Sequence, residues 1–214
     1  MTNDELARQY PKLHHMSEAG SWPSIQKHGL LSTTALLDLY EITGPKRTQI
    51  ESQVRPKSVC IEHPEYGIAV VRDQAALCDK PRKNIYLKNC LDGVTPAEWC
   101  KFLNRKTYFW PDFKPLGWML NSYMYRDRAH WIIIVDTRIL LNRHSNDVTI
   151  SNTNSGSIWN GKRRGIDVFQ PMKDYRNRYA SELAVDYSVP DIAKLATSVE
   201  EWKGNAKIRT IWSA

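Results

Sequence analysis

The sequence lacks the long apolar runs and the cysteine clusters that mark membrane proteins and zinc proteins. No apolar run approaches the roughly 20 residues that a membrane-spanning helix needs. The first residues are polar and lack the apolar core of a targeting segment, so we expect a cytoplasmic protein with no membrane partner. The cysteines form no Cys-x-x-Cys pair and no histidine cluster at zinc-ligand spacing, so we expect reduced thiols and no metal. They are Cys60, Cys78, Cys90 and Cys100.

Common nucleotide-binding and hydrolase motifs are missing as well. The chain contains no Gly-x-Gly-x-x-Gly, no P-loop, no Gly-x-Ser-x-Gly and no His-Glu-x-x-His, which disfavours the usual dinucleotide-binding folds. No internal repeat or low-complexity tract occurs, and the 11 prolines are scattered rather than gathered into a linker. With 214 residues, the simplest organisation is a single domain over 1–214.

Positive charge is in excess and is grouped. The chain has 30 Lys and Arg against 23 Asp and Glu, a net charge of +7. Such clusters with aromatic residues nearby suit phosphate contact and base stacking, although a solvated basic face without a partner has the same composition. The clusters lie at Lys80–Lys83, Lys101–Lys106, Arg126–Arg128 and Lys162–Arg164.

Local patterns predict a mixed α+β fold. The segment 131–135 is the most apolar strand candidate and should lie at the centre of a sheet. Helix starts are predicted at Ser21, at Ser32 and at the capping box of Thr95, and Gly44–Pro45 should end the second helix. Further strands are predicted at 13–16, 58–61, 67–71, 107–110, 148–150 and 168–169, and further helices at 116–125 and 191–199.

The segment from Arg178 to Ile192 contains one carboxylate in an otherwise apolar strand. Apolar residues flank Glu182 at Ala180 and at 183–185, and Val189–Pro190 ends the strand. A carboxylate in such a setting must be paired, hydrated or used in chemistry. The alternative is an edge-strand glutamate that faces solvent.

Three separated elements resemble the ADP-ribosyltransferase fold, which grips NAD with a histidine, an aromatic residue and a glutamate on three strands. The closest resemblance is to the DarT family of nucleic-acid ADP-ribosyltransferase toxins. Residues 41–100 contribute little to it. The matching segments are Leu13–Ser17 with Trp22–Ile25 and His28–Ser32, Tyr108–Trp110 with Leu116 and Met119–Leu120, and Ala180–Asp186 with Val189–Pro190.

The resemblance implies an ADP-ribosyltransferase-like split mixed β-sheet cleft with flanking helices, and NAD as co-substrate without a metal. It assigns catalysis to Glu182 and, in a weak motif, to Arg55. A carboxylate hydrogen-bonded to the ribose 2′-hydroxyl stabilises an oxocarbenium-like centre, and it can accept a proton from the attacking base nitrogen. Arg55 would neutralise the diphosphate or the charge on the target, although a surface ion pair is the commoner role of an arginine.

The same resemblance assigns NAD binding to four residues, and the histidine and the two aromatic residues also have an ordinary structural interpretation. His15, with His14 as competitor, would hold a ribose hydroxyl, or would be a hydrogen-bonded strand histidine. Ser17 would fix the nicotinamide amide. Tyr108 or Phe109 would stack on nicotinamide, or would pack in the core.

The implied function is transfer of ADP-ribose from NAD to a base in single-stranded RNA or DNA, by a toxin or phage-defence effector with an antitoxin partner. Single strands unstack a base at low cost. The loop with Asn154, Lys162, Arg163 and Arg164 would contact the nucleic acid. One alternative is a protein ADP-ribosyltransferase or a tRNA 2′-phosphotransferase-like enzyme. Another is a non-enzymatic nucleic-acid-binding protein.

Overall fold

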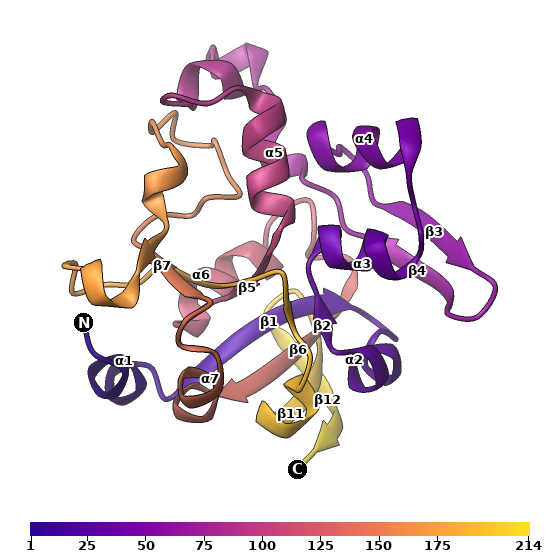
Figure 1. The fold of residues 1–214 in the computed structure, drawn as a ribbon, viewed down its shortest axis with the longest axis vertical. Helices are drawn as coiled ribbons and strands as arrows, with labels where there is room; N and C mark the ends of the chain where they lie inside the picture. The colour runs from indigo at the N-terminus through magenta and orange to yellow at the C-terminus, as the bar shows by residue number, and fades with distance from the viewer.

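Two four-stranded antiparallel sheets form the centre of the computed structural model, which describes residues 1–214 (Figure 1). The first sheet has the order β1 (Lys12–Glu18), β6 (Ala129–Asp136), β11 (Ala196–Lys203) and β12 (Ala206–Ser213). The second has the order β5 (Lys106–Phe109), β9 (Glu182–Asp186), β7 (Val148–Ser151) and β8 (Gln170–Pro171). The predicted α+β class is confirmed, and β6 lies inside its sheet as expected.

The edge strands of the two sheets, β1 and β5, meet at one bridge. The His14 N–H donates to the Trp110 carbonyl at 3.0 Å, and the Trp110 N–H donates to the His14 carbonyl at 2.8 Å. The backbone ladder does not continue from this bridge, because the His15 side chain, rather than a backbone group, contacts the Tyr108 carbonyl. The two sheets are therefore joined at His14 and split next to it.

Helices and two small two-stranded pairings surround the sheets (Figure 1). α5 (Pro96–Asn104) begins with the predicted capping box of Thr95 and leads into β5. The other α-helices are α1 (Asn3–Gln9), α2 (Trp22–His28), α3 (Thr33–Leu39), α4 (Gly44–Ser52), α6 (Phe113–Leu120), α7 (Thr137–His144) and α8 (Ile192–Leu195). The pairings are β3 (Val59–His63) with β4 (Gly67–Val71), and β2 (Leu30–Leu31) with β10 (Ser188–Val189). No helix has the length and apolarity that crossing a membrane would require.

The largest apolar cluster lies between the sheets and the helices α1 and α7. It combines Ile133 and Val135 of β6 with Leu183 and Val185 of β9, all of them fully buried. A second cluster gathers around Trp99 of α5. Burial of this apolar area supplies most of the free energy that favours folding, and it fixes the strands that carry the polar site residues.

Two details of the predicted helix ends differ in the structure. α2 starts after Ser21 as predicted, but the Ser21 hydroxyl donates to the Glu18 carbonyl at 2.7 Å and does not cap the helix. Gly44–Pro45 opens α4 instead of closing α3, because α3 already ends at Leu39 and proline fits the first turn of a helix.

Two further corrections concern strands. The segment predicted as a helix over 191–199 forms only the short α8 and then enters β11, where Val199 pairs with Ile133. A register shift between Ala196 and Ser198 interrupts the strand alternation, so that the apolar spacing imitates a helix. At 168–169 the chain leaves a 3₁₀ turn, and the strand follows at Gln170–Pro171.

Candidate active site around Glu182

Glu182 opens β9, which lies between β5 and β7 in the second sheet. Glu182 is 5% exposed, and it pairs in register with Ser151 of β7. Leu183 and Val185 point into the core, so Glu182 and Ala184 face the opposite side of the sheet. The predicted buried position of Glu182 is confirmed, and the edge-strand alternative is wrong because β9 has neighbours on both sides.

The Glu182 carboxylate is held by one loop residue. The Ser155 backbone N–H donates to Glu182 Oε2 at 3.0 Å. Burial raises the pKa of Glu182 to about 7, while the Ser155 hydrogen bonds and the charge of Arg164 act in the opposite direction. A carboxyl group with this pKa exists in both protonation states near neutral pH, so it can accept and release a proton there.

Arg164 organises the loop that presents Ser155. Its guanidinium donates to the carbonyls of Asn154 at 2.7 Å, Ser157 at 2.6 Å, Lys162 at 3.0 Å and, more weakly, Ser155 at 3.4 Å. The residue is 2% exposed, and burial lowers the pKa of Arg164. The expectation that Arg164 contacts nucleic acid is therefore wrong: its hydrogen-bonding capacity is used inside the loop.

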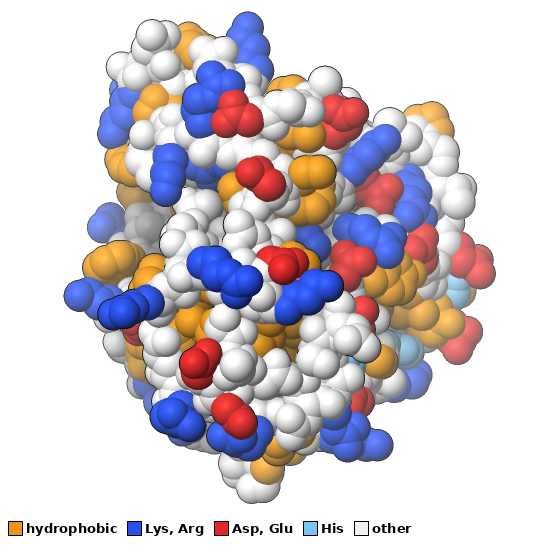
Figure 2. Space-filling view, turned by 60° about the vertical axis from the view of Figure 1, so that its left-hand side comes forward, with side chains coloured by type: hydrophobic (Ala, Val, Ile, Leu, Met, Phe, Trp, Pro, Cys, Tyr) orange, Lys and Arg blue, Asp and Glu red, His pale blue; other side chains and the backbone are white.

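The other residues predicted to contact nucleic acid are on the surface. Asn154, Lys162 and Arg163 are exposed. Arg163 forms an ion pair with Asp92, whereas Lys162 forms none. Figure 2 shows Lys and Arg side chains distributed over one face of the molecule with Asp and Glu among them, so positive charge is not confined to a single stripe.

Tyr108 and Phe109 occupy opposite faces of β5. Phe109 is fully buried in the main core cluster, which corrects the expectation that its ring is available for stacking. Tyr108 is half-buried, lies opposite Ala184 in register, and so shares a face of the sheet with Glu182. Its hydroxyl donates to the Leu103 carbonyl at 2.9 Å. Burial, and secondarily the charge of Glu182, raises the pKa of Tyr108.

His15 lies at the split between the two sheets. Its Nδ1 is 2.8 Å from the Tyr108 carbonyl, and because a carbonyl only accepts, Nδ1 carries the hydrogen. Burial lowers the pKa of His15 to about 4, so the ring is neutral at physiological pH and Nε2 is an acceptor. His14 instead contacts the Trp110 carbonyl at 3.2 Å and packs edge-on against Phe113.

Ser17 and Arg55 are used inside the fold. The Ser17 hydroxyl donates to the Trp131 carbonyl at 3.1 Å within the first sheet. The buried Arg55 donates to the carbonyls of Ile50 and Arg72 and to Asn104 Oδ1. Burial lowers the pKa of Arg55 to about 10. These contacts correct the assignment of Arg55 to catalysis, because its guanidinium already serves three internal acceptors.

Sequence reasoning missed a charged cluster next to His15. Arg72 follows β4, and its charge contributes to the low pKa of His15. Its Nη1 is buried without a hydrogen-bond partner and lies 3.6 Å from Glu18 Oε2. The available signal was a charged pair, Arg72 and Asp73, directly after the apolar strand candidate 67–71. We call this the Arg72 cluster; it consists of Glu18, Arg72, Asp73, Tyr125, Arg128 and His130.

Comparison with known families gives one assignment. The sequence model of a family of unknown function, DUF7002, matches residues 11–196. The chain belongs to the DUF7002 family. The match spans β1 with His15 and β9 with Glu182, and it ends where the C-terminal hairpin of β11 and β12 begins. No curated protein matches this DUF7002 chain.

Proposed function

We propose that this DUF7002 protein is an NAD-dependent mono-ADP-ribosyltransferase that modifies a base in single-stranded nucleic acid. The observation that carries the proposal is Glu182, a buried carboxylate with a pKa of about 7 on a central strand. It shares a face with Tyr108, whose carbonyl holds the neutral His15 at the split between the sheets. This combination supports the function that the resemblance to DarT implies.

The polar atoms around the split suit a dinucleotide. Arg72 Nη1 is buried without a hydrogen-bond partner, with Glu18 Oε2 at 3.6 Å, and this N–H suits one oxygen of a diphosphate. In this proposal Arg72 takes the role that the sequence assigned to Arg55. His15 Nε2 accepts a hydrogen bond from a ribose hydroxyl, and the Tyr108 ring packs against nicotinamide. NAD would supply the ADP-ribosyl group, with nicotinamide as the leaving group.

Glu182 serves two steps. As a carboxylate it accepts a hydrogen bond from the ribose 2′-hydroxyl and stabilises the positive charge that develops when the bond from ribose C1′ to nicotinamide breaks. The base nitrogen then forms the new bond to C1′ and loses a proton to Glu182, which passes it to solvent. A carboxylate with a pKa of about 7 is matched to this second task.

The target class follows from charge. The net charge of +7 favours a polyanion over an acidic protein surface, and the exposed Lys162 lies on the loop that also presents Ser155 to Glu182. ADP-ribosylation of bases in the cell's own nucleic acid would harm the cell that carries the enzyme. We therefore propose a toxin or defence effector with a neutralising antitoxin.

The test is transfer of label from NAD to separate pools of single-stranded DNA, single-stranded RNA and cell protein. Label should enter a nucleic-acid pool with the native chain, and Glu182→Ala and Glu182→Gln should abolish it. Glu62→Ala is the matched control, because Glu62 is an exposed strand glutamate on β3. Label in protein alone would establish the protein-modifying alternative.

Two other outcomes identify the remaining alternatives. Removal of a 2′-phosphate from RNA by a variant that lacks Glu182 would support a phosphotransferase, because that chemistry depends on arginine and histidine around a phosphate. NAD-independent binding of nucleic acid without any label transfer would make the protein a non-enzymatic binder.

A further inference from the structure

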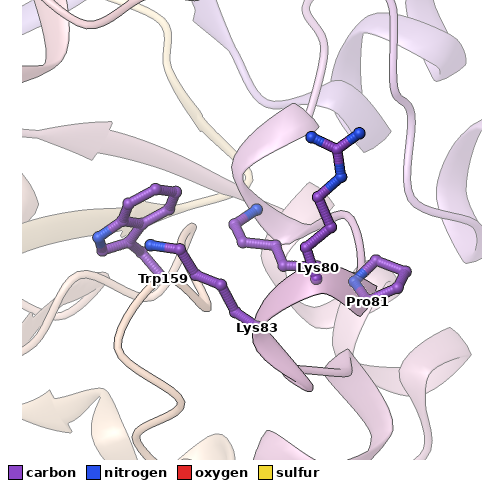
Figure 3. A pocket seen from close by; sticks show the side chains of 5 residues that line it. Lys80, Pro81, Lys83 and Trp159 are labelled. Atoms are coloured by element: carbon purple, nitrogen blue, oxygen red, sulfur yellow. The ribbon is translucent and has the colours of Figure 1, made fainter.

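Trp159 displays its indole on the surface beside a basic segment. The residue is 62% exposed, and it lines a cavity of about 430 Å³ with Lys80, Pro81, Arg82 and Lys83 (Figure 3). The Lys83 ammonium lies 3.6 Å from the centroid of the Trp159 ring, and that of Lys80 lies 5.9 Å from it. An aromatic face and several cations therefore converge on one hollow.

The position of Trp159 is fixed by its neighbours in the loop. Ile158 is fully buried in the second core cluster, and its N–H donates to the Ala76 carbonyl at 3.2 Å. The Gly161 N–H donates to the Ile158 carbonyl at 3.0 Å, in a turn where Gly161 has φ +65°. The indole is thus exposed by an anchored turn, and it keeps a large apolar surface in water.

The cations of this hollow have no acidic partners. Lys80, Arg82 and Lys83 form no ion pair within 4.0 Å in the structure. Lys80 Nζ donates only to carbonyls, to Cys78 at 3.1 Å and to Ala76 at 3.5 Å. Three uncompensated positive charges make the hollow attractive to a polyanion.

We infer that Trp159 is a stacking platform for a base of single-stranded nucleic acid, and that Lys80, Arg82 and Lys83 contact the phosphates on either side. Lys83 covers one face of the indole through a cation–π contact, and it must move from the ring to a phosphate when a base stacks on that face. The inference deepens the proposed function and rests on it for the target class. It also connects the platform to Glu182, because Trp159 and Ser155 belong to the loop that Arg164 holds.

An acidic peptide would use the same cations but would gain little from the ring face. The platform therefore predicts a dependence on bases, which separates nucleic acid from any other polyanion. Base stacking is worth about 1–3 kcal/mol per base in alanine substitutions, equivalent to roughly 5- to 150-fold in affinity.

The experiment measures fluorescence anisotropy of labelled single-stranded DNA and RNA with the full chain in the absence of NAD. Trp159→Ala should weaken binding roughly 5- to 150-fold. Trp118→Ala is the matched control and should bind like the native chain, since Trp118 is 67% exposed and carries Lys114 at 5.5 Å from its ring. An abasic strand of equal length should bind the native chain and Trp159→Ala equally. Lys83→Ala should reduce the slope of log affinity against log salt by about one.

Unchanged affinity in Trp159→Ala, or an equal loss in Trp159→Ala and Trp118→Ala, would overturn the platform. So would tighter binding of a polyglutamate peptide than of either nucleic acid. Because the assay contains no NAD, its outcome is independent of ADP-ribosyl transfer. Loss of binding in Trp159→Ala together with absent label transfer would leave the platform standing while the proposed chemistry fails.

Discussion

Ser155 and Glu182 are joined by a hydrogen bond of 3.0 Å from the Ser155 backbone N–H to Glu182 Oε2. The donor belongs to a loop and the acceptor to a central strand, so the contact makes the carboxylate depend on the loop's conformation. Arg164 in turn holds that loop through the carbonyls of four residues, Asn154, Ser155, Ser157 and Lys162. Arg164 is therefore a positioning residue for Glu182.

Arg164→Lys should impair transfer without removing charge. A lysine cannot satisfy several carbonyls with the geometry of a guanidinium, so the loop loosens and the rate falls on the order of 10- to 100-fold. Loss of the Ser155 hydrogen bond would also raise the pKa of Glu182 further, since that bond lowers it. The check is the pH profile of transfer, whose midpoint should move upward. A reduced rate with an unchanged midpoint would mean that Arg164 contributes only to stability.

The activity should rise with pH through a midpoint near 7. Glu182 acts as the carboxylate, burial raises its pKa to about 7, and the pH dependence of kcat/KM reports groups of the free enzyme. His15 has a pKa of about 4 and remains neutral, so it adds no second inflection between about pH 5 and 9. Initial rates over this range test the prediction, and a profile that falls with pH would contradict it.

Glu182→Gln should stabilise the fold at alkaline pH. The pKa of Glu182 is raised from 4.5 when unfolded to about 7 when folded, so the native chain loses stability as pH rises through this window. The glutamine never ionises and still accepts from the Ser155 N–H. The difference in unfolding free energy should be near zero at pH 4 and reach up to about 3 kcal/mol at pH 8. Urea unfolding at both pH values measures it.

Much of the fold could be predicted because its signals are local. The bounds of α2, the capping box of Thr95 and the apolar β6 depend on short patterns, and all of these features occur in the structure. The C-terminal hairpin was missed because its first strand, β11, contains a register shift at 196–198 and reads as helical. The meeting of β1 and β5 at His14 is a tertiary event with no local signal.

The site was predicted only in part, because some of its features have a local sequence signal and others depend on tertiary contacts. Glu182 was identified as a single carboxylate among apolar strand residues, because burial of a charge costs free energy and is seldom found without a structural or functional role. The arginines could not be sorted, because sequence does not show which guanidinium meets internal carbonyls. Arg55 and Arg164 do so, whereas Nη1 of Arg72 makes no hydrogen bond and is paired only with Glu18, at 3.6 Å.

Arg72 and Arg55 should respond differently to the same change. Arg72→Lys should lower transfer on the order of 10-fold or more through weaker NAD binding, with a smaller effect on stability than Arg55→Lys, because Nη1 makes no hydrogen bond in the fold and a lysine can keep the ion pair with Glu18. Arg55→Lys should lower stability by about 1–3 kcal/mol, because buried acceptors lose their donor. Thermal unfolding and the KM for NAD, measured for both variants, separate the two roles. Equal loss of activity at equal stability would restore Arg55 as a site residue.

Gly29 ties the end of α2 to the segment that follows the Glu182 strand, and Gly29→Ala should weaken this junction. Gly29 has φ +84°, and an added Cβ would lie 2.6 Å from the Pro190 Cα, so an alanine meets both backbone strain and a clash. Gly20 offers a matched control, because it has φ +90° with nothing within 4 Å of an added Cβ. Gly20→Ala should cost about 1–2 kcal/mol from strain alone. Gly29→Ala should cost more, since Pro190 must move, and β10 pairs with β2 beside it. Urea unfolding of both variants measures the difference, and equal costs would show that the clash relaxes freely.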